Sequence, residues 1–263
     1  VGCVPATFGV PGVEQHAIFL KEIDDARRIR QTLIANLERA SLPGTSPEEQ
    51  ARLLHLVAVG GGPTGVRFAG ELYDLLKRDL RRGYEPLVEK VRVTVVDSHA
   101  TLLSTYDQNL RDYVQQEFTR RGVTLRTGAK VERVTEHGIY LKDQEFLPCG
   151  LVLWSTGFAR NPLLTNATLE LDRAGRIITD DHLRATGQAN IYALGDCACP
   201  QGEALPQLAQ VAEQQGRYLA KCLNARAHGK PITPFQWKPW GTSSFIGGGS
   251  AVADGTSQRA GFW

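Results

Sequence analysis

The chain has 263 residues, of which 42% are hydrophobic and 22% are charged, a composition that suits a globular protein with more than one core. Its formal net charge of +2 gives no electrostatic support for nucleic-acid binding. No apolar run approaches the roughly 18 residues that cross a bilayer, so a transmembrane protein is not expected, although a peripheral one is compatible. The absence of methionine indicates that the chain does not begin at its initiator residue.

The cysteines and histidines argue against a disulfide framework and against a metal site. The five cysteines form no CxxC pair and are expected to be free thiols. The six histidines never fall at metal-ligand spacing, so no metal ligands are assigned.

The first half of the chain predicts helices and buried strands in alternation. After a Gly- and Pro-rich opening, apolar residues at helical spacing predict a helix over about Phe19–Arg39, and Pro47 followed by two glutamates predicts the start of a short one. The run LHLVAVGGG then predicts a buried strand that ends in glycines. A helical face over about Thr64–Leu80 and the β-branched strand Val91–Asp97 complete a strand–helix–strand unit.

Further elements are expected along the rest of the chain. They are a helix over Asn109–Arg121, a strand in LVLWSTG (Leu151–Gly157), an apolar strand over Ile191–Leu194 and a helix over about Leu208–Leu223. The tail after Pro231 is rich in glycine and aromatic residues. These elements predict an α/β fold with two doubly wound, Rossmann-like dinucleotide-binding domains, of which the flavin domain is incomplete.

A glycine-rich motif, Gly60-Gly61-Gly62-Pro63-Thr64-Gly65, is the strongest single signal. It contains G-x-G-x-x-G after a predicted strand and before a predicted helix, which is the context that dinucleotide binding requires. Gly60 allows the tight turn, Gly62 lets a pyrophosphate approach the backbone at the positive end of the helix, and Gly65 permits close helix–strand packing.

Asp97 ends the second strand of this unit. A carboxylate there accepts hydrogen bonds from the adenosine ribose and repels a 2′-phosphate, so Asp97 favours NADH over NADPH. His99 weakens this inference, because a cation beside the carboxylate would tolerate a phosphate.

Two strand-end turns, LVLWSTG and IYALGDCA, form the second signal. In flavin-binding doubly wound domains, a Gly-Asp after the last strand places a carboxylate on the ribityl chain of the flavin, and Gly195-Asp196 fits that role. The dipeptide is weak evidence alone, and its weight comes from its position.

Taken in order, the segments VGxxPxTFGVPGV, FLKEIxDAxxIR, GGGPTGV-FAGEL, LWSTG, IYALGDCA and LPQLAQVAEQQGxYLA resemble the type II (alternative) NADH:quinone oxidoreductases of mitochondria. The resemblance covers nearly the whole chain. It implies an enzyme with FAD and NADH that passes electrons to a membrane quinone without pumping protons, bound peripherally to the mitochondrial inner membrane and assembled as a homodimer.

The resemblance also implies a domain plan and roles for individual residues. Residues 1–51 would be a remnant of the FAD domain with a connecting helix, 52–155 an inserted NADH domain, and 156–263 the return of the FAD domain, truncated before its membrane-docking helices. NADH would contact Gly60, Gly61, Gly62, Gly65 and Asp97, with Thr156 and Gly157 along its nicotinamide half; Gly195 and Asp196 would bind FAD, and Gln210 and Gln214 would border the flavin and the quinone.

Three departures from the family pattern qualify these expectations. The flavin pyrophosphate loop near the N-terminus is missing, which predicts poor FAD binding by this chain alone. Arg67 stands where the family carries a glutamate that faces nicotinamide and flavin, and this charge reversal is not conservative. The chain also stops where relatives continue toward the membrane.

Two alternatives follow from the same sequence. One is another FAD/NAD-linked reductase, of the sulfide:quinone or ferredoxin type, although no recognisable cysteine pair supports sulfide chemistry. The other is a non-catalytic NADH-binding protein, which Arg67 and the missing flavin loop favour.

Overall fold

The computed structural model describes residues 2–142, 144–202, 204–255 and 261–262. The chain forms two compact units. The larger consists of Thr7–Gly157 together with Gly241–Trp263, and the smaller of Val1–Ala6 together with Phe158–Trp240. The chain therefore enters the larger unit twice.

A five-stranded parallel sheet is the centre of the larger unit, with the strand order β2-β9-β3-β4-β5. The strands are β2 (Ile18–Phe19), β3 (His55–Val59), β4 (Arg92–Asp97), β5 (Thr124–Thr127) and β9 (Leu151–Trp154). All five residues of β3 are buried, as expected for a parallel strand covered on both faces. The predicted α/β fold class is confirmed.

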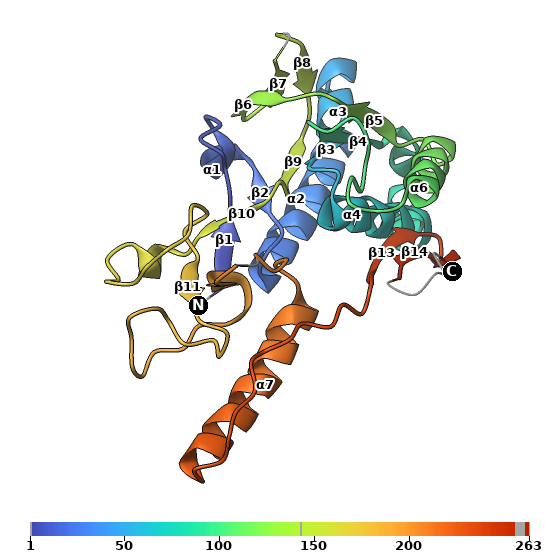
Figure 1. The fold of residues 1–263 in the computed structure, drawn as a ribbon. Helices are drawn as coiled ribbons and strands as arrows, with labels where there is room; N and C mark the ends of the chain where they lie inside the picture. The colour runs from blue at the N-terminus through green and yellow to red at the C-terminus, as the bar shows by residue number, and fades with distance from the viewer. Residues whose placement is uncertain (1, 143, 203, 256–260, 263) are drawn as a thin grey trace. The chain divides into compact units, whose positions relative to one another are not determined.

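Helices cover one face of this sheet and a small antiparallel sheet covers the other (Figure 1). Leu56 and Ala58 pack into the core that the helices share, whereas Val57 and Val59 pack into the core of the opposite face, because successive side chains of a strand alternate. The helices are α2 (Ile23–Ser41), α4 (Pro63–Asp74) and α6 (Gln108–Arg120); the opposite layer has α1 (Val13–His16), β6 (Val131–Thr135), β7 (Gly138–Leu141) and β8 (Phe146–Pro148).

Two predicted helix boundaries were wrong. The helix expected from Phe19 begins at Ile23, because Phe19 pairs with Trp154 in the parallel sheet. The carboxylate of Asp25 then accepts the N–H groups of Lys21 and Glu22, both at 2.9 Å, at the start of the helix. The helix expected to reach Leu80 leaves regular α geometry after Asp74 and continues as a π-helical turn, η1 (Leu75–Asp79).

Short elements complete the first part of this unit. They are α3 (Pro47–Leu53), which begins at Pro47 as predicted, α5 (Arg81–Tyr84) and the 3-10 turn η2 (Leu87–Lys90).

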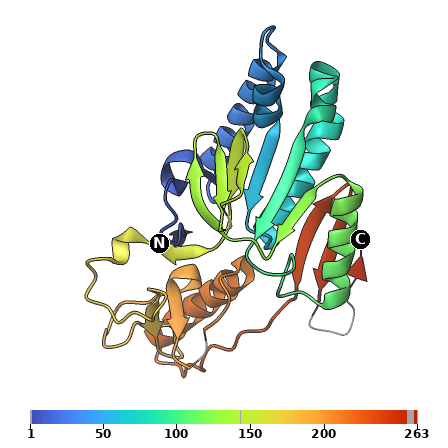
Figure 2. The same cartoon turned by 90° about the horizontal axis from the view of Figure 1, so that it is seen from above.

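The chain returns to the larger unit as an antiparallel sheet of β13 (Thr242–Gly247), β14 (Ser250–Asp254) and β15 (Gly261–Phe262). The β13–β14 hairpin packs beside α4 and α6 (Figure 2). A Cβ built on Gly70 of α4 would lie 2.5 Å from the carbonyl carbon of Ile246, so only glycine allows this approach. The Asp74 carboxylate also accepts the Gly248 N–H at 2.9 Å, and the Arg121 guanidinium donates to the Ile246 carbonyl.

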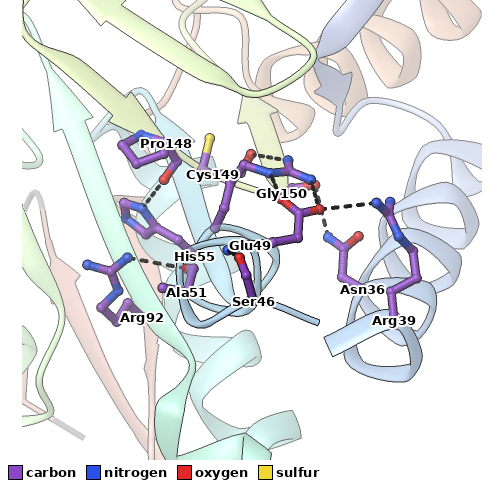
Figure 3. Close-up of polar contacts among 11 residues, drawn as sticks. Asn36, Arg39, Ser46, Glu49, Ala51, His55, Arg92, Pro148, Cys149 and Gly150 are labelled. Atoms are coloured by element: carbon purple, nitrogen blue, oxygen red, sulfur yellow. Dashed lines mark hydrogen bonds and ion pairs between the residues drawn. The ribbon is translucent and has the colours of Figure 1, made fainter. Parts of the chain in front are cut away.

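A polar network joins the amino ends of the central strands (Figure 3). His55, which is 5% exposed, faces the Pro148 carbonyl through Nδ1 at 2.6 Å and the Thr94 hydroxyl through Nε2 at 2.8 Å. Asn36 donates to the Gly150 carbonyl at 2.9 Å. In parallel sheets, ligands bind at the carboxyl ends of the strands. This network lies at the opposite edge of the sheet, and we interpret its role as structural.

Burial lowers the pKa of His55, with a smaller contribution from the charge of Arg92 and an opposing one from the Pro148 carbonyl. The folded protein therefore holds a neutral imidazole that the unfolded chain protonates near the ordinary value of 6.5. The stability from this group is complete above that value and is lost as pH falls toward the lower folded pKa.

We expect the free energy of unfolding to fall between pH 7.5 and pH 5.5 in urea titrations, and to fall less steeply in His55→Asn, which has no titrating ring. The same pH slope in both proteins would show that His55 is not the responsible group.

The smaller unit has two short strand pairs and one long helix. Strand β1 (Cys3–Pro5) pairs antiparallel with β10 (Phe158–Arg160), and β11 (Ile177–Thr179) pairs parallel with β12 (Ala198–Pro200). The helix is α7 (Ala209–Ala227), and the 3-10 turns are η3 (Pro162–Leu164) and η4 (Gly195–Cys197).

The strand predicted over Ile191–Leu194 is not formed. Tyr192 makes a single bridge to Arg184, and no ladder extends from it within the described residues. Isoleucine and tyrosine favour an extended backbone, but a strand also requires a neighbour that continues the hydrogen bonds. Among the described residues, no helix combines the length and the apolar character needed to cross a bilayer.

Candidate dinucleotide-binding site

The predicted glycine motif forms the turn between β3 and α4, at the carboxyl end of the central strand. Gly60 has a φ of 112° and donates its N–H to the Val96 carbonyl at 2.8 Å. Gly62 precedes the first residue of α4, and a Cβ placed on it would meet no atom within 4 Å. The turn therefore presents an open position at a helix N-terminus, where the helix dipole and backbone N–H groups favour a phosphate.

Gly65 makes the close packing that the motif predicts. It is buried in the first turn of α4, and a Cβ built on it would lie 1.8 Å from the Gly60 carbonyl oxygen. Any side chain here would push α4 away from the end of β3.

Asp97 lies at the end of β4 with 11% of its side chain exposed, and it faces the glycine turn. One carboxylate oxygen accepts the Gly61 N–H at 2.5 Å. The other accepts the His99 backbone N–H at 2.6 Å and lies 2.8 Å from His99 Nδ1. A carboxylate has about four acceptor positions, so these three contacts fix its orientation and leave capacity for a ligand hydroxyl.

Further residues support the turn and were not singled out from the sequence. The Leu103 N–H donates to the Gly61 carbonyl at 2.8 Å, and Leu102 fills the space beside Gly61. The Ser155 hydroxyl donates to the Val59 carbonyl at 3.1 Å. Ser155 precedes the predicted Thr156 and Gly157 in the sequence. Its position at the end of the same strand could therefore have identified it as a residue of the site.

Thr156 and Gly157 follow β9, the strand next to β3 on the side away from β4. Gly157 has a φ of 149°, which favours glycine. The sheet thus brings Thr156 and Gly157 to the edge that carries the glycine turn and Asp97.

Arg67 is exposed on α4, two residues after Gly65. Burial raises the pKa of the Tyr106 hydroxyl, and the positive charge of Arg67 opposes that rise. Arg67 therefore carries its charge close to the Tyr106 hydroxyl.

In the smaller unit, Gly195 and Asp196 belong to the turn η4, which follows an extended segment and not the strand that was predicted before it. Gly195 has a φ of 70° and donates its N–H to the side-chain oxygen of Gln215 at 2.6 Å. The Asp196 carboxylate accepts from the Cys3 thiol at 3.3 Å, and the Asp196 carbonyl accepts from the Gln207 amide at 3.0 Å. A small cavity beside Asp196 is lined in part by Cys3 and Gln207.

Gln210 and Gln214 lie one turn apart on α7, and both bind the backbone of the segment that follows the helix. Gln214 donates to the Lys238 carbonyl at 2.8 Å and accepts the Lys238 N–H at 3.0 Å. Gln210 accepts the Trp240 N–H at 2.9 Å. Both glutamines therefore hold residues 238–240 against α7, and Gln215, which was not singled out from the sequence, holds the Gly195 turn.

Over the described ranges, no three His, Cys, Asp or Glu side chains gather in a way that would hold a metal ion.

Comparison with known proteins places these features in a family. The sequence matches the pyridine nucleotide-disulphide oxidoreductases over residues 1–216. A probable NADH dehydrogenase of Dictyostelium discoideum is 40% identical over 255 residues, which are 96% of this chain and 56% of that protein. An internal alternative NAD(P)H-ubiquinone oxidoreductase A1, mitochondrial, from Solanum tuberosum is 39% identical over 96% of this chain and 54% of its own length.

Among solved structures, NDH2 from Plasmodium falciparum in complex with NADH superposes with a TM-score of 0.93 at 24% identity, over 99% of this chain and 69% of that one. At that identity the superposition shows the fold. The chain spans about half the length of the curated relatives it matches. From the family match over most of its length, the chain belongs to the pyridine nucleotide-disulphide oxidoreductase family.

Proposed function

We propose that the larger unit binds NADH at the glycine turn between β3 and α4. The observation that carries this proposal is the combination of an open helix N-terminus at Gly62 with a fixed carboxylate at Asp97. Gly60, Gly61 and Gly65 shape the turn for the pyrophosphate, Asp97 receives the adenosine ribose, and Thr156 and Gly157 lie along the nicotinamide half. The domain that performs this binding is centred on residues 52–155.

We further propose that the full-length protein is an NADH:quinone oxidoreductase of the non-proton-pumping type. Family membership and the names of the two relatives support this. Asp196, beside its cavity, would hold the ribityl chain of FAD, and Gln210 and Gln214 would border the flavin and the quinone. When bound, FAD supplies the redox chemistry that joins a two-electron donor to a quinone.

The proposed location is the mitochondrial inner membrane, as a peripheral protein and a homodimer. Support for the organelle comes from the Solanum tuberosum relative, whose name includes mitochondrial.

The experiment that tests the whole activity follows NADH oxidation by the full-length protein with a short-chain quinone, against NADPH, while the flavin absorbance is recorded. Turnover of NADH with quinone by a yellow protein is the expected result. A protein that binds NADH but does not reduce quinone would contradict the oxidoreductase proposal and leave the binding proposal intact.

Arg67 supports one alternative, a non-catalytic NADH-binding protein, because its charge stands where the resembled enzymes carry a carboxylate. The Arg67→Glu variant separates the two functions in the same assay. We expect the turnover rate of Arg67→Glu to differ severalfold from that of the wild type, and its Kd for NADH to differ less. Turnover that appears only in Arg67→Glu would establish the non-catalytic function for the wild-type protein.

The Asp97→Asn variant tests the proposed preference for NADH. Asparagine has one acceptor oxygen, and its NH2 group would face an N–H donor at Gly61 or His99. It also removes the charge that repels a 2′-phosphate. We expect about tenfold weaker NADH binding, which corresponds to about 1.4 kcal/mol, and a comparable loss of discrimination against NADPH, both measured as Kd.

Asp79→Asn is the matched control, because it removes the same charge from an exposed position of η1, roughly 24 Å along the helical axis from the glycine turn at about 1.5 Å per residue. An equal change in both variants would show that net charge, and not the Asp97 contact, sets the preference.

A further inference from the structure

The turn at Thr7–Val10 has an unusual residue in a conformation that favours glycine. The Val10 N–H donates to the Thr7 carbonyl at 3.0 Å. Both central residues have positive φ, 51° at Phe8 and 70° at Gly9, as a type I′ turn requires. Asparagine or glycine normally fills the first of these positions, whereas a bulky phenylalanine there is strained.

Core packing does not explain this phenylalanine. Phe8 is 70% exposed, and it belongs to neither hydrophobic core of the larger unit. Its ring lies against the backbone of Gly157, where a Cβ would sit 3.1 Å from the Phe8 Cζ atom. A strained residue that keeps a large apolar ring in solvent is expected where the ring has a ligand to contact.

The position of the ring follows from the order of the strands. A dinucleotide binds where the strand order of the sheet reverses, between β3 and β9, with its adenosine on the β4 side. Asp97 marks that side at the end of β4. Gly157, and with it the Phe8 ring, lies just beyond the end of β9, on the other side of the glycine turn. Phe8 therefore stands on the nicotinamide half.

We propose that Phe8 is a binding residue for the nicotinamide end of NADH, and that its exposed ring packs against the nicotinamide. This proposal rests on the proposed NADH site. A Cβ on Gly157 would press against this ring at 3.1 Å, and the left-handed turn at Phe8 leaves the ring 70% exposed.

The test compares NADH with ADP-ribose, which keeps the adenosine, the pyrophosphate and the second ribose but lacks nicotinamide. Kd values for both are measured by calorimetry with this chain. We expect Phe8→Ala to weaken NADH about tenfold, in the range of aromatic contacts, and to change ADP-ribose less than twofold. Phe8→Tyr keeps the ring and should bind both ligands as the wild type does.

Phe8→Gly separates the ligand contact from a structural role. Glycine relieves the positive φ, so its melting temperature should rise by a few degrees while its NADH affinity falls as in Phe8→Ala. Phe146→Ala is the matched control, because Phe146 is also partly exposed in the larger unit, where its ring contacts Tyr140. Neither affinity should change in that variant.

The outcomes distinguish this proposal from the function on which it rests. A wild-type chain that binds neither NADH nor ADP-ribose would overturn the proposed site itself. If the wild type binds both, equal weakening of the two ligands by Phe8→Ala, or no weakening of either, would overturn the nicotinamide contact alone.

Discussion

Gly65→Ala is expected to abolish NADH binding and to destabilise the larger unit. The added Cβ would lie 1.8 Å from the Gly60 carbonyl oxygen, and the atom in the way is backbone. Helix α4 must therefore move off the end of β3, at a cost of about 3 kcal/mol, the upper range for overpacking. The Kd for NADH should rise more than 100-fold, and chemical denaturation should show the loss of stability.

Gly62→Ala is the matched control for this result, since a Cβ there meets no protein atom and φ is −75°. We expect this variant to unfold as the wild type does but to bind NADH more weakly, because the methyl group occupies the approach of the pyrophosphate. Wild-type stability and affinity in Gly65→Ala would contradict the packing described for the turn.

Gly70→Ala is expected to release the β13–β14 hairpin from α4. Its Cβ would lie 2.5 Å from the Ile246 carbonyl carbon and 2.6 Å from the Gly247 nitrogen. Ile246 and Val252 are fully buried in the wild-type packing. Exposing one such side chain costs about 1.5–3 kcal/mol, so we expect a loss of about 2–4 kcal/mol and much faster amide hydrogen exchange in residues 243–247.

Gly83→Ala tests whether the loss of stability is specific to the position on α4 where the hairpin packs. Gly83 lies on the nearby helix α5, where an added Cβ would meet no atom within 4 Å and φ is not positive. That variant should keep wild-type stability or gain a few tenths of a kcal/mol. Protected hairpin amides in Gly70→Ala would show that the hairpin is held by other contacts.

The sequence predicted the elements whose pattern is local. Strand β3 is a short run of apolar residues followed by glycines, and α4 carries its apolar residues at helical spacing, so both were recognised. The turn between them and Asp97 followed from the motif. Their placement at one edge of the sheet follows from parallel pairing, which the motif implies.

Features set by distant partners were not predicted. Phe19 was assigned to a helix because its pairing with Trp154 leaves no local trace. Ile191–Leu194 was assigned to a strand because local composition does not reveal whether a neighbouring strand is present. The conformation of Phe8 was also missed, since its sequence context shows only a Gly- and Pro-rich loop.

The return of the chain to α4 has a consequence for the order of events during synthesis. Asp74 and Gly248, which hold the hairpin in place, are 174 positions apart in the chain. At about 5–20 residues per second, a ribosome needs on the order of ten seconds or more between them. Throughout that interval, the face of α4 that the β13–β14 hairpin covers in the folded protein is exposed in the nascent chain. A chaperone that binds apolar helical surfaces would find a binding site there.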